Sequence, residues 1–175
     1  MLTFHDLYAS YAQDVYRFSY WLTGDPVEAE DITSETFIRS WTRFGSIRTE
    51  TLKAYLLKIA RNTYLEQLRK QRRQTTLPDT WPDPLPGPEQ LAEDHAELEM
   101  VQRILQNLPE IDRAAFILRV QQNLPYREIA RVLGLSEVAA RVKVHRVRQK
   151  LLRARASEQA LCIDGEPATS VEVAL

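Results

Sequence analysis

The amino-acid sequence predicts an all-α protein in which two small helical domains are joined by a proline-rich linker. Apolar residues recur at helical spacing on both sides of the linker, without the alternation typical of strands. Five of the nine prolines lie within residues 77–88, LPDTWPDPLPGP, where fixed φ angles and missing amide donors exclude a helix or a central strand. A chain of 175 residues is long enough for two such domains. We therefore expect domains at 1–75 and 91–156, a linker at 76–90 and an acidic tail at 157–175.

Three helices are predicted in the N-terminal domain. Thr3 is suited to cap the first helix and Gly24 to end it. Asp25 and Pro26 then supply an N-cap and a first helical residue, so a second helix begins there. After a loop, the third helix is expected at residues 52–73, and it ends in a basic tract.

Four helices are predicted in the C-terminal domain. The first begins near residue 89, and Pro109 breaks it and opens the second. Pro125 and Gly134 bound a short third helix. The fourth helix is expected over residues 136–155, with a serine as its N-cap.

Charge is strongly segregated along the chain, although the formal net charge is only −1. Residues 51–74 carry seven Lys and Arg against one acidic residue, and residues 125–156 carry nine against two. Residues 75–100, which include the linker, carry seven acidic residues and no Lys or Arg. Two basic segments, one in each domain, favour nucleic-acid binding over two merely solvated helix faces.

Composition excludes several other classes of protein. No run of eighteen apolar residues is present and the first residues do not resemble a secretion signal, so we expect a cytoplasmic protein. The single cysteine, Cys162, excludes an internal disulfide and a cysteine-rich zinc module. With three histidines besides, no metal site and no cofactor are expected.

A helix-turn-helix is predicted between residues 125 and 151, PYREIARVLGLSEVAARVKVHRVRQKL. Ala130 and Ala140 are small residues where the two helices meet, and Gly134 tolerates the left-handed turn between them. An apolar stripe on the second helix is expected to face the core: Ala140, Val144, Val147 and Leu151. The opposite surface is basic and suits the major groove, whereas the plainer alternative is a helical hairpin with a basic face.

Four motifs resemble the sigma-70 family of bacterial sigma factors. Residues 108–119, LPEIDRAAFILR, and 124–136, LPYREIARVLGLS, are similar to the promoter-binding region four of that family. Residues 29–37, AEDITSETF, and 56–62, LLKIARN, are similar to its region two. Because only these two regions and a short linker are present, the resemblance is to the extracytoplasmic-function group.

The resemblance implies a non-enzymatic subunit that binds core RNA polymerase and recognises two promoter elements. Residues implied to contact the upstream (−35) element are Arg127, Arg141, Lys143, His145, Arg146 and Arg148. Residues implied to contact the downstream (−10) element are Arg48, Lys53, Lys58, Arg61 and Asn62. Residues implied to bind core polymerase are Asp31, Glu35, Phe37 and Trp41. The expected partners are core polymerase, promoter DNA and an anti-sigma factor, which is often membrane-bound in this family, with no small-molecule substrate.

Elementary chemistry is compatible with these roles. Asp31 and Glu35 lie one helical turn apart beside Phe37 and Trp41, a combination suited to a basic coiled coil. The alternative is a solvated acidic face with Phe37 and Trp41 in the core. The loop at residues 46–51 is expected to hold a base that is flipped out of the melted duplex.

Other classes of function remain open at this point. A helix-turn-helix regulator that acts without polymerase would share the C-terminal domain, but it would not need the acidic and aromatic helix of the first domain. An enzyme is disfavoured because no phosphate-binding loop, zinc-protease motif or nucleophile elbow is present in the sequence. A pure interaction scaffold would not need seven basic residues in residues 51–74.

Overall fold

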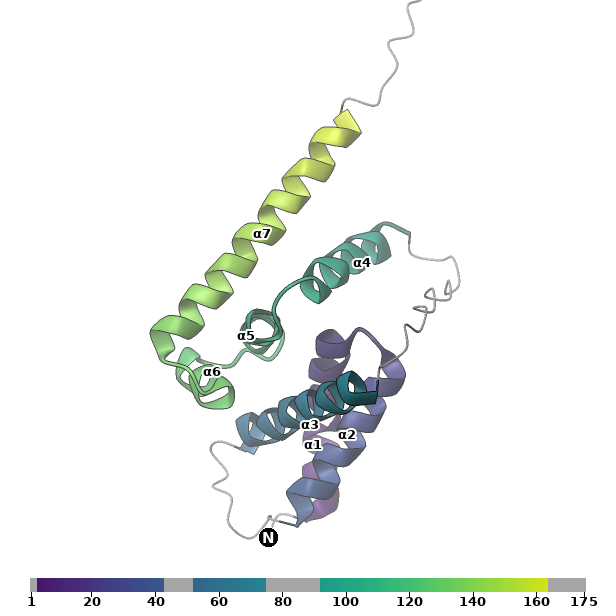
Figure 1. The fold of residues 1–175 in the computed structure, drawn as a ribbon, viewed down its shortest axis with the longest axis vertical. Coiled ribbons are helices and arrows are strands. Elements are labelled where there is room, and N and C mark those ends of the chain that lie inside the picture. The colour runs from purple at the N-terminus through teal and green to yellow at the C-terminus, as the bar shows by residue number, and fades with distance from the viewer. Residues whose placement is uncertain (1–2, 43–51, 75–91, 164–175) are drawn as a thin grey trace, which may run out of the picture.

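The computed structural model describes residues 3–42, 52–74 and 92–163, which form seven α-helices and no strand (Figure 1). In chain order the helices are α1 (Phe4–Thr23), α2 (Pro26–Trp41), α3 (Leu52–Gln74), α4 (Ala92–Gln106), α5 (Glu110–Val120), α6 (Tyr126–Leu133) and α7 (Glu137–Ile163). None of these helices combines the length and the apolar character that a membrane span requires. The predicted linker lies outside the described residues.

The predicted caps of the first two helices are confirmed. The Thr3 hydroxyl accepts a hydrogen bond from the Asp6 amide at 3.2 Å, and the Asp6 carboxylate accepts one from the Thr3 amide at 2.9 Å. Gly24 ends α1 in the left-handed region, with φ of 80°. The Asp25 carboxylate caps α2 by accepting from the amide of Val27 at 2.7 Å. These local bonds satisfy amides that have no partner within the helix.

The first three helices form an N-terminal bundle, in which α1 packs on α2 and both pack on α3. Its core consists of apolar side chains at helical spacing: Leu7, Val15, Phe18, Leu22, Ile32, Phe37, Leu56, Leu57 and Ala60. In Figure 1, α3 lies across this bundle on the side nearer to α5 and α6. The helix with the first basic segment therefore also borders the second half of the chain.

The last four helices form the C-terminal half of the structure, its C-terminal bundle, in which α5, α6 and α7 pack on one another and α6 and α7 are the predicted helix-turn-helix. Ala130 and Ala140 are buried where the two helices meet, and Gly134 adopts a left-handed φ of 68°. Val144 and Val147 face the core as the stripe requires. The prediction of these contacts from spacing alone is confirmed.

One helix is longer than predicted, and another is buried only in part. The prediction ended α7 near Arg155, but the helix continues to Ile163, and it projects beyond the bundle in Figure 1. In α4, Leu98 is 51% exposed, whereas Leu105 is fully covered. Only the end of α4 is near enough to the other helices for burial, because α4 extends away from them (Figure 1).

The two bundles are packed against each other. Buried apolar residues of both belong to one continuous cluster, and α3 contacts α6 while α1 contacts α5. Polar contacts also join them, because the Gln122 side chain donates to the Asp14 carbonyl at 3.0 Å and the Gln106 side chain donates to the Trp21 carbonyl at 3.3 Å. The structure thus presents the two basic segments in one compact body.

Gly134 provides a test of the turn between α6 and α7. A Cβ atom at this position would meet no atom within 4 Å, so only the backbone conformation disfavours other residues. Gly134→Ala is expected to lower the free energy of unfolding by about 1 kcal/mol in urea titrations, the cost of placing an L-residue in the left-handed region. Gly134→Asn should cost less, because asparagine tolerates this region better, and equal losses would contradict the explanation.

Candidate functional site

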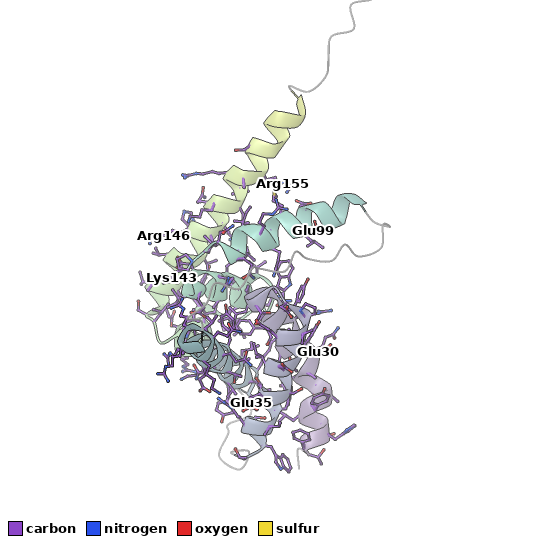
Figure 2. All side chains as sticks on the ribbon, turned by 45° about the vertical axis from the view of Figure 1, so that its right-hand side comes forward. Glu30, Glu35, Glu99, Lys143, Arg146 and Arg155 are labelled. Carbon is purple, nitrogen blue, oxygen red and sulfur yellow. The ribbon has the colours of Figure 1, made fainter. Side chains whose placement is uncertain are left out.

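The outer surface of α7 carries most of the cations predicted to contact the upstream element. Arg141, His145, Arg146 and Arg148 are all exposed. Figure 2 shows Arg146 on the side of α7 that faces away from the other helices. The alternation of buried valines with exposed cations along α7 produces this surface, which is accessible to a DNA groove.

Lys143 differs from its neighbours on α7. Its ammonium group donates to the Asp112 carboxylate of α5 at 2.6 Å, and the two side chains are only 22% and 20% exposed. The prediction of Lys143 as a phosphate contact is therefore not supported by its position, since a carboxylate already neutralises it. The ion pair instead ties α7 to α5.

Arg127, at the start of α6, is exposed as expected. Its guanidinium lies 3.9 Å from the Glu128 carboxylate, which also accepts a closer hydrogen bond from Arg131 at 2.8 Å. The exposed guanidinium of Arg127 is therefore accessible to a phosphate group that approaches α6.

On α3, two of the predicted residues border an open pocket of about 550 Å³. Lys58 and Asn62 are exposed and line it. The pocket also has wall residues that the sequence did not single out: Arg39, Thr42, Tyr55, Ile59 and Glu66. It offers charged, amide and aromatic groups, which is the combination that holds single-stranded nucleic acid. Arg48, the predicted loop residue, lies outside the described residues.

Lys53 and Arg61 of α3 are paired with carboxylates. Lys53 lies 2.9 Å from the Asp14 carboxylate of α1. Arg61 donates through Nε and Nη2 to the two oxygens of Glu110 on α5, at 2.6 and 2.8 Å. The side chains of Arg61 and Glu110 are only 12% and 17% exposed. Arg61 therefore faces α5, and its predicted contact with the downstream element stays a prediction.

A second polar contact lies beside Arg61 and joins the bundles. Arg113 of α5 is buried and donates to the Tyr64 hydroxyl of α3 at 2.9 Å and to the Gln106 side chain at 2.6 Å. Burial raises the pKa of Tyr64 above its ordinary value, and the neutral hydroxyl accepts the hydrogen bond from Arg113. Together with the Arg61 pair, this contact holds α5 against the basic helix α3.

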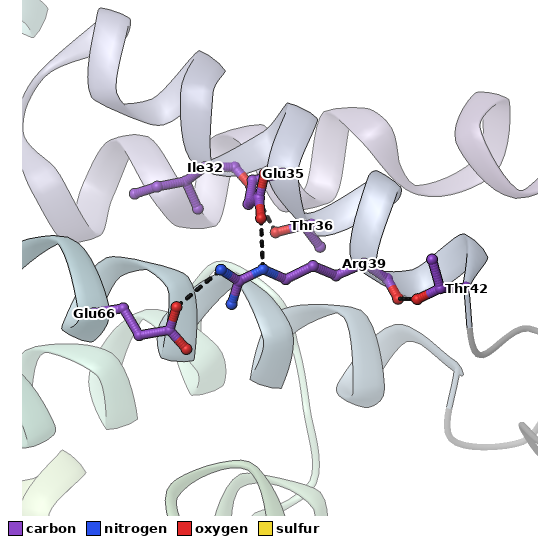
Figure 3. A network of polar contacts seen from close by, with 6 residues as sticks. All are labelled: Ile32, Glu35, Thr36, Arg39, Thr42 and Glu66. Carbon is purple, nitrogen blue, oxygen red and sulfur yellow. Dashed lines mark hydrogen bonds and ion pairs between the residues drawn. The ribbon is translucent and has the colours of Figure 1, made fainter.

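The acidic face of α2 includes a network that connects it to α3 (Figure 3). The Arg39 guanidinium donates to the Glu35 carboxylate at 2.6 Å, and a second nitrogen lies 2.8 Å from the Glu66 carboxylate. The hydrogen bond from Arg39 holds the pKa of Glu66 below its ordinary value, and the hydrogen bonds to both carboxylates raise the pKa of Arg39. Glu35, predicted to bind polymerase, is therefore also a structural partner of Arg39.

The Glu66 contact predicts a specific pH dependence of stability. Because its pKa is lower in the folded protein, the contact stabilises above the ordinary pKa of 4.5, and the effect disappears as pH falls through the folded value. Glu66→Gln should therefore reduce the free energy of unfolding at pH 7 by less than about 1 kcal/mol, since the pair is partly exposed. In urea titrations the difference should shrink as pH falls below 4.5, and a difference that does not change with pH in this acidic range would exclude the ion pair as its cause.

The remaining predicted polymerase contacts occupy different environments. Asp31 is exposed on α2, and Trp41 is 53% exposed near Phe4, with ring centroids 5.0 Å apart. Phe37 is only 2% exposed and packs against Tyr8 at a centroid distance of 4.8 Å. Phe37 therefore lies in the core, which is the alternative that the sequence left open, because α1 covers this side of α2.

Several residues that shape these surfaces were not found by sequence reasoning. The Glu35 to Arg39 spacing of four residues is a signal of an ion pair within a helix, and it was present in the sequence. Glu110, Asp112 and Asp14 gave no such signal, because each pairs with a cation on another helix.

Both bundles match known protein families. Residues 7–74 match the family described as Sigma-70 region 2, and residues 98–151 match the family described as Sigma-70, region 4. The two matches follow the order expected from the sequence motifs. Together they span more than half of the chain.

Individual relatives agree with these matches. The chain is 34% identical over 156 residues to ECF RNA polymerase sigma factor SigE of Mycolicibacterium smegmatis, covering 86% of this chain and 61% of that protein. It is 30% identical over 152 residues to ECF RNA polymerase sigma factor SigM of Bacillus subtilis, covering 86% and 93%. The chain thus spans less than two thirds of SigE but nearly all of SigM.

A solved structure shares the fold. The sigma factor RpoE of Bartonella quintana, crystallised with the anti-sigma factor NepR, matches with a TM-score of 0.66 and 22% identity, covering 83% of this chain and 92% of that one. At this level of identity the likeness concerns the arrangement of the helices.

Proposed function

Since this chain belongs to the extracytoplasmic-function group of the sigma-70 family of RNA polymerase sigma factors, we propose that it joins core RNA polymerase and directs it to specific promoters. The observation that carries the proposal is the presence of both family regions in order on one chain, each with its own basic helix. Two DNA-binding helices on one subunit can specify a promoter by two separated elements. This role needs no catalytic residue in the chain. We propose that the protein acts in the cytoplasm.

The exposed cations of α7 are proposed to read the upstream element. In a helix-turn-helix, the N-terminal part of the second helix contacts base edges in the major groove, and the flanking residues contact phosphates. Arg141, His145 and Arg146 are assigned to bases, and Arg148 and Arg127 to phosphates. The exposure of all five side chains supports this assignment.

The pocket beside α3 is proposed to bind the downstream element. Lys58 and Asn62 supply a positive charge and an amide for phosphate and base, and Tyr55 supplies a ring for stacking. The pairing of Arg61 with Glu110 means that Arg61 contacts DNA only after α5 has moved away from α3. Promoter binding is thus proposed to require separation of the two bundles.

The exposed part of α2 is proposed to bind core polymerase through Asp31, Glu35 and Trp41. An acidic and aromatic surface is complementary to a basic helical partner. An anti-sigma factor is proposed as a second partner, since apolar side chains such as Ile38 and Trp41 are exposed on the same helix. The solved relative RpoE has such a partner in its crystal.

Transcription with purified components tests the proposed function. The full chain is mixed with core polymerase and a library of promoter fragments, and the transcripts are sequenced. We expect co-purification with core polymerase and initiation from fragments that share two elements. Sequence-specific duplex binding without association with polymerase would favour the alternative, a helix-turn-helix regulator that acts alone.

A further inference from the structure

Tyr126, the first residue of α6, contacts the guanidinium groups of two arginines from the helices on either side in sequence. The Cζ atoms of Arg119 on α5 and Arg141 on α7 each lie 4.9 Å from the centre of the Tyr126 ring. A guanidinium at this distance over a ring is attracted by the negative face of the π system. One ring therefore gathers two cations at the junction of α5, α6 and α7.

The Tyr126 ring and Arg119 form the fixed part of this cluster. Tyr126 is partly buried and packs against the apolar core, and Arg119 donates to the Leu124 carbonyl at 3.0 Å. Arg141, in contrast, is exposed. The exposed arginine thus rests on a ring that the core and the neighbouring turn hold in place.

Arg141 lies about one turn inside α7, where a recognition helix reaches base edges. The turn before it is fixed, because the Ser136 hydroxyl accepts a hydrogen bond from the Ala139 amide at 3.1 Å. A free arginine side chain loses much rotamer freedom when it binds DNA. An arginine already stacked on a ring loses less, so its contact with DNA is stronger.

We propose that Tyr126 is a positioning residue for recognition of the upstream element, because its ring holds Arg141 in the direction required for DNA contact. The inference rests on the proposed function, in which α7 reads that element. Arg119 places a second positive charge against the same ring, and like charges on one ring repel each other. An acceptor group of DNA relieves this repulsion when it bonds to Arg141, which favours the bound state.

A double-mutant cycle on the full chain tests the proposal. The probe is a duplex that the wild-type protein selects from a randomised pool, compared with a scrambled duplex of equal length. The readout is the specificity ratio, which is the Kd for the scrambled duplex divided by the Kd for the selected duplex. Tyr126→Met is expected to lower this ratio about three- to fivefold, whereas Tyr126→Phe retains the ring and keeps the ratio. In an Arg141→Ala background, Tyr126→Met should have no further effect.

The outcomes separate this inference from the proposed function. If Arg141→Ala lowers the ratio and Tyr126→Met does not, the positioning role fails while DNA reading by α7 stands. If Tyr126→Met still lowers the ratio in the Arg141→Ala background, its role is structural and the inference is overturned. If Arg141→Ala leaves the ratio unchanged, both the contact and its positioning are excluded.

A measurement on the wild-type protein covers the case in which Tyr126→Met fails to fold. The ring current of Tyr126 should shift the side-chain protons of Arg141 upfield in NMR spectra, relative to those of the exposed Arg127 on α6. Equal shifts for the two arginines would show that the stacking is absent in solution and would overturn the proposal.

Discussion

Glu110→Lys is expected to separate the two bundles and to strengthen the binding of single-stranded DNA by α3. The substitution removes both hydrogen bonds to Arg61 and places a second positive charge beside a guanidinium that is only 12% exposed. Breaking a fully buried ion pair by changing one partner costs about 3–5 kcal/mol. The Arg61–Glu110 pair is part-buried, so we expect a smaller cost, and it falls on the contact between α3 and α5. Small-angle X-ray scattering should show a larger radius of gyration, and Arg61 should become available to DNA.

Glu97→Lys is the matched control for this experiment. It makes the same change in charge at an exposed ion pair, in which Glu97 lies 3.4 Å from Arg155 within the C-terminal bundle. We expect it to leave the radius of gyration unchanged. The gain in DNA affinity of Glu110→Lys should also disappear in an Arg61→Ala background. Equal gains for both lysine variants would mean that net charge alone is responsible.

Arg146→Ala is expected to weaken binding to a selected upstream element by about 1–3 kcal/mol, or roughly 5- to 150-fold, while binding to scrambled duplex changes little. The reason is that Arg146 is exposed on the outer surface of α7, where an arginine can bond a guanine through two hydrogen bonds (Figure 2). Fluorescence anisotropy with both duplexes measures the difference.

Arg148→Ala provides the comparison for Arg146→Ala. A phosphate contact carries no sequence information, so its loss should weaken binding to the selected and the scrambled duplex by the same factor. It should also reduce the slope of log affinity against log salt concentration by about 1. If Arg146→Ala also weakened binding to both duplexes by the same factor, Arg146 would be a phosphate contact, and other residues of α7 would have to contact the bases.

The helices themselves were largely predictable from the sequence. Thr3, Asp25 and Gly134 act through bonds or dihedral angles within a few residues, so their effects follow from the residue type and its spacing. The stripe from Ala140 to Val147 could be assigned for the same reason. The end of α7 was predicted less well, since the predicted helix ended near Arg155 and the observed one continues to Ile163.

The candidate surfaces were predictable only in part. The exposed cations of α7 lie where their spacing placed them, opposite the buried valines. Phe37 shares α2 with the exposed Trp41, and only the packing of α1 distinguishes the two environments. For Lys53, Arg61 and Lys143, the sequence indicated a positive charge correctly, but it could not indicate that each charge is already paired.

The sequence alone determined the fold class, the helix-turn-helix and the presence of one basic segment in each half of the chain. These features depend on periodicity, capping and local charge, which operate over a few residues. Only the tertiary structure decided which cations are free to meet DNA, because a carboxylate such as Glu110 reaches Arg61 across 49 positions of the chain and at 2.6 Å in space. The basic residues that the net charge of −1 conceals are therefore of two kinds: exposed ones, such as Arg146 on α7 and Lys58 on α3, and paired ones, such as Lys143 on α7 and Arg61 on α3.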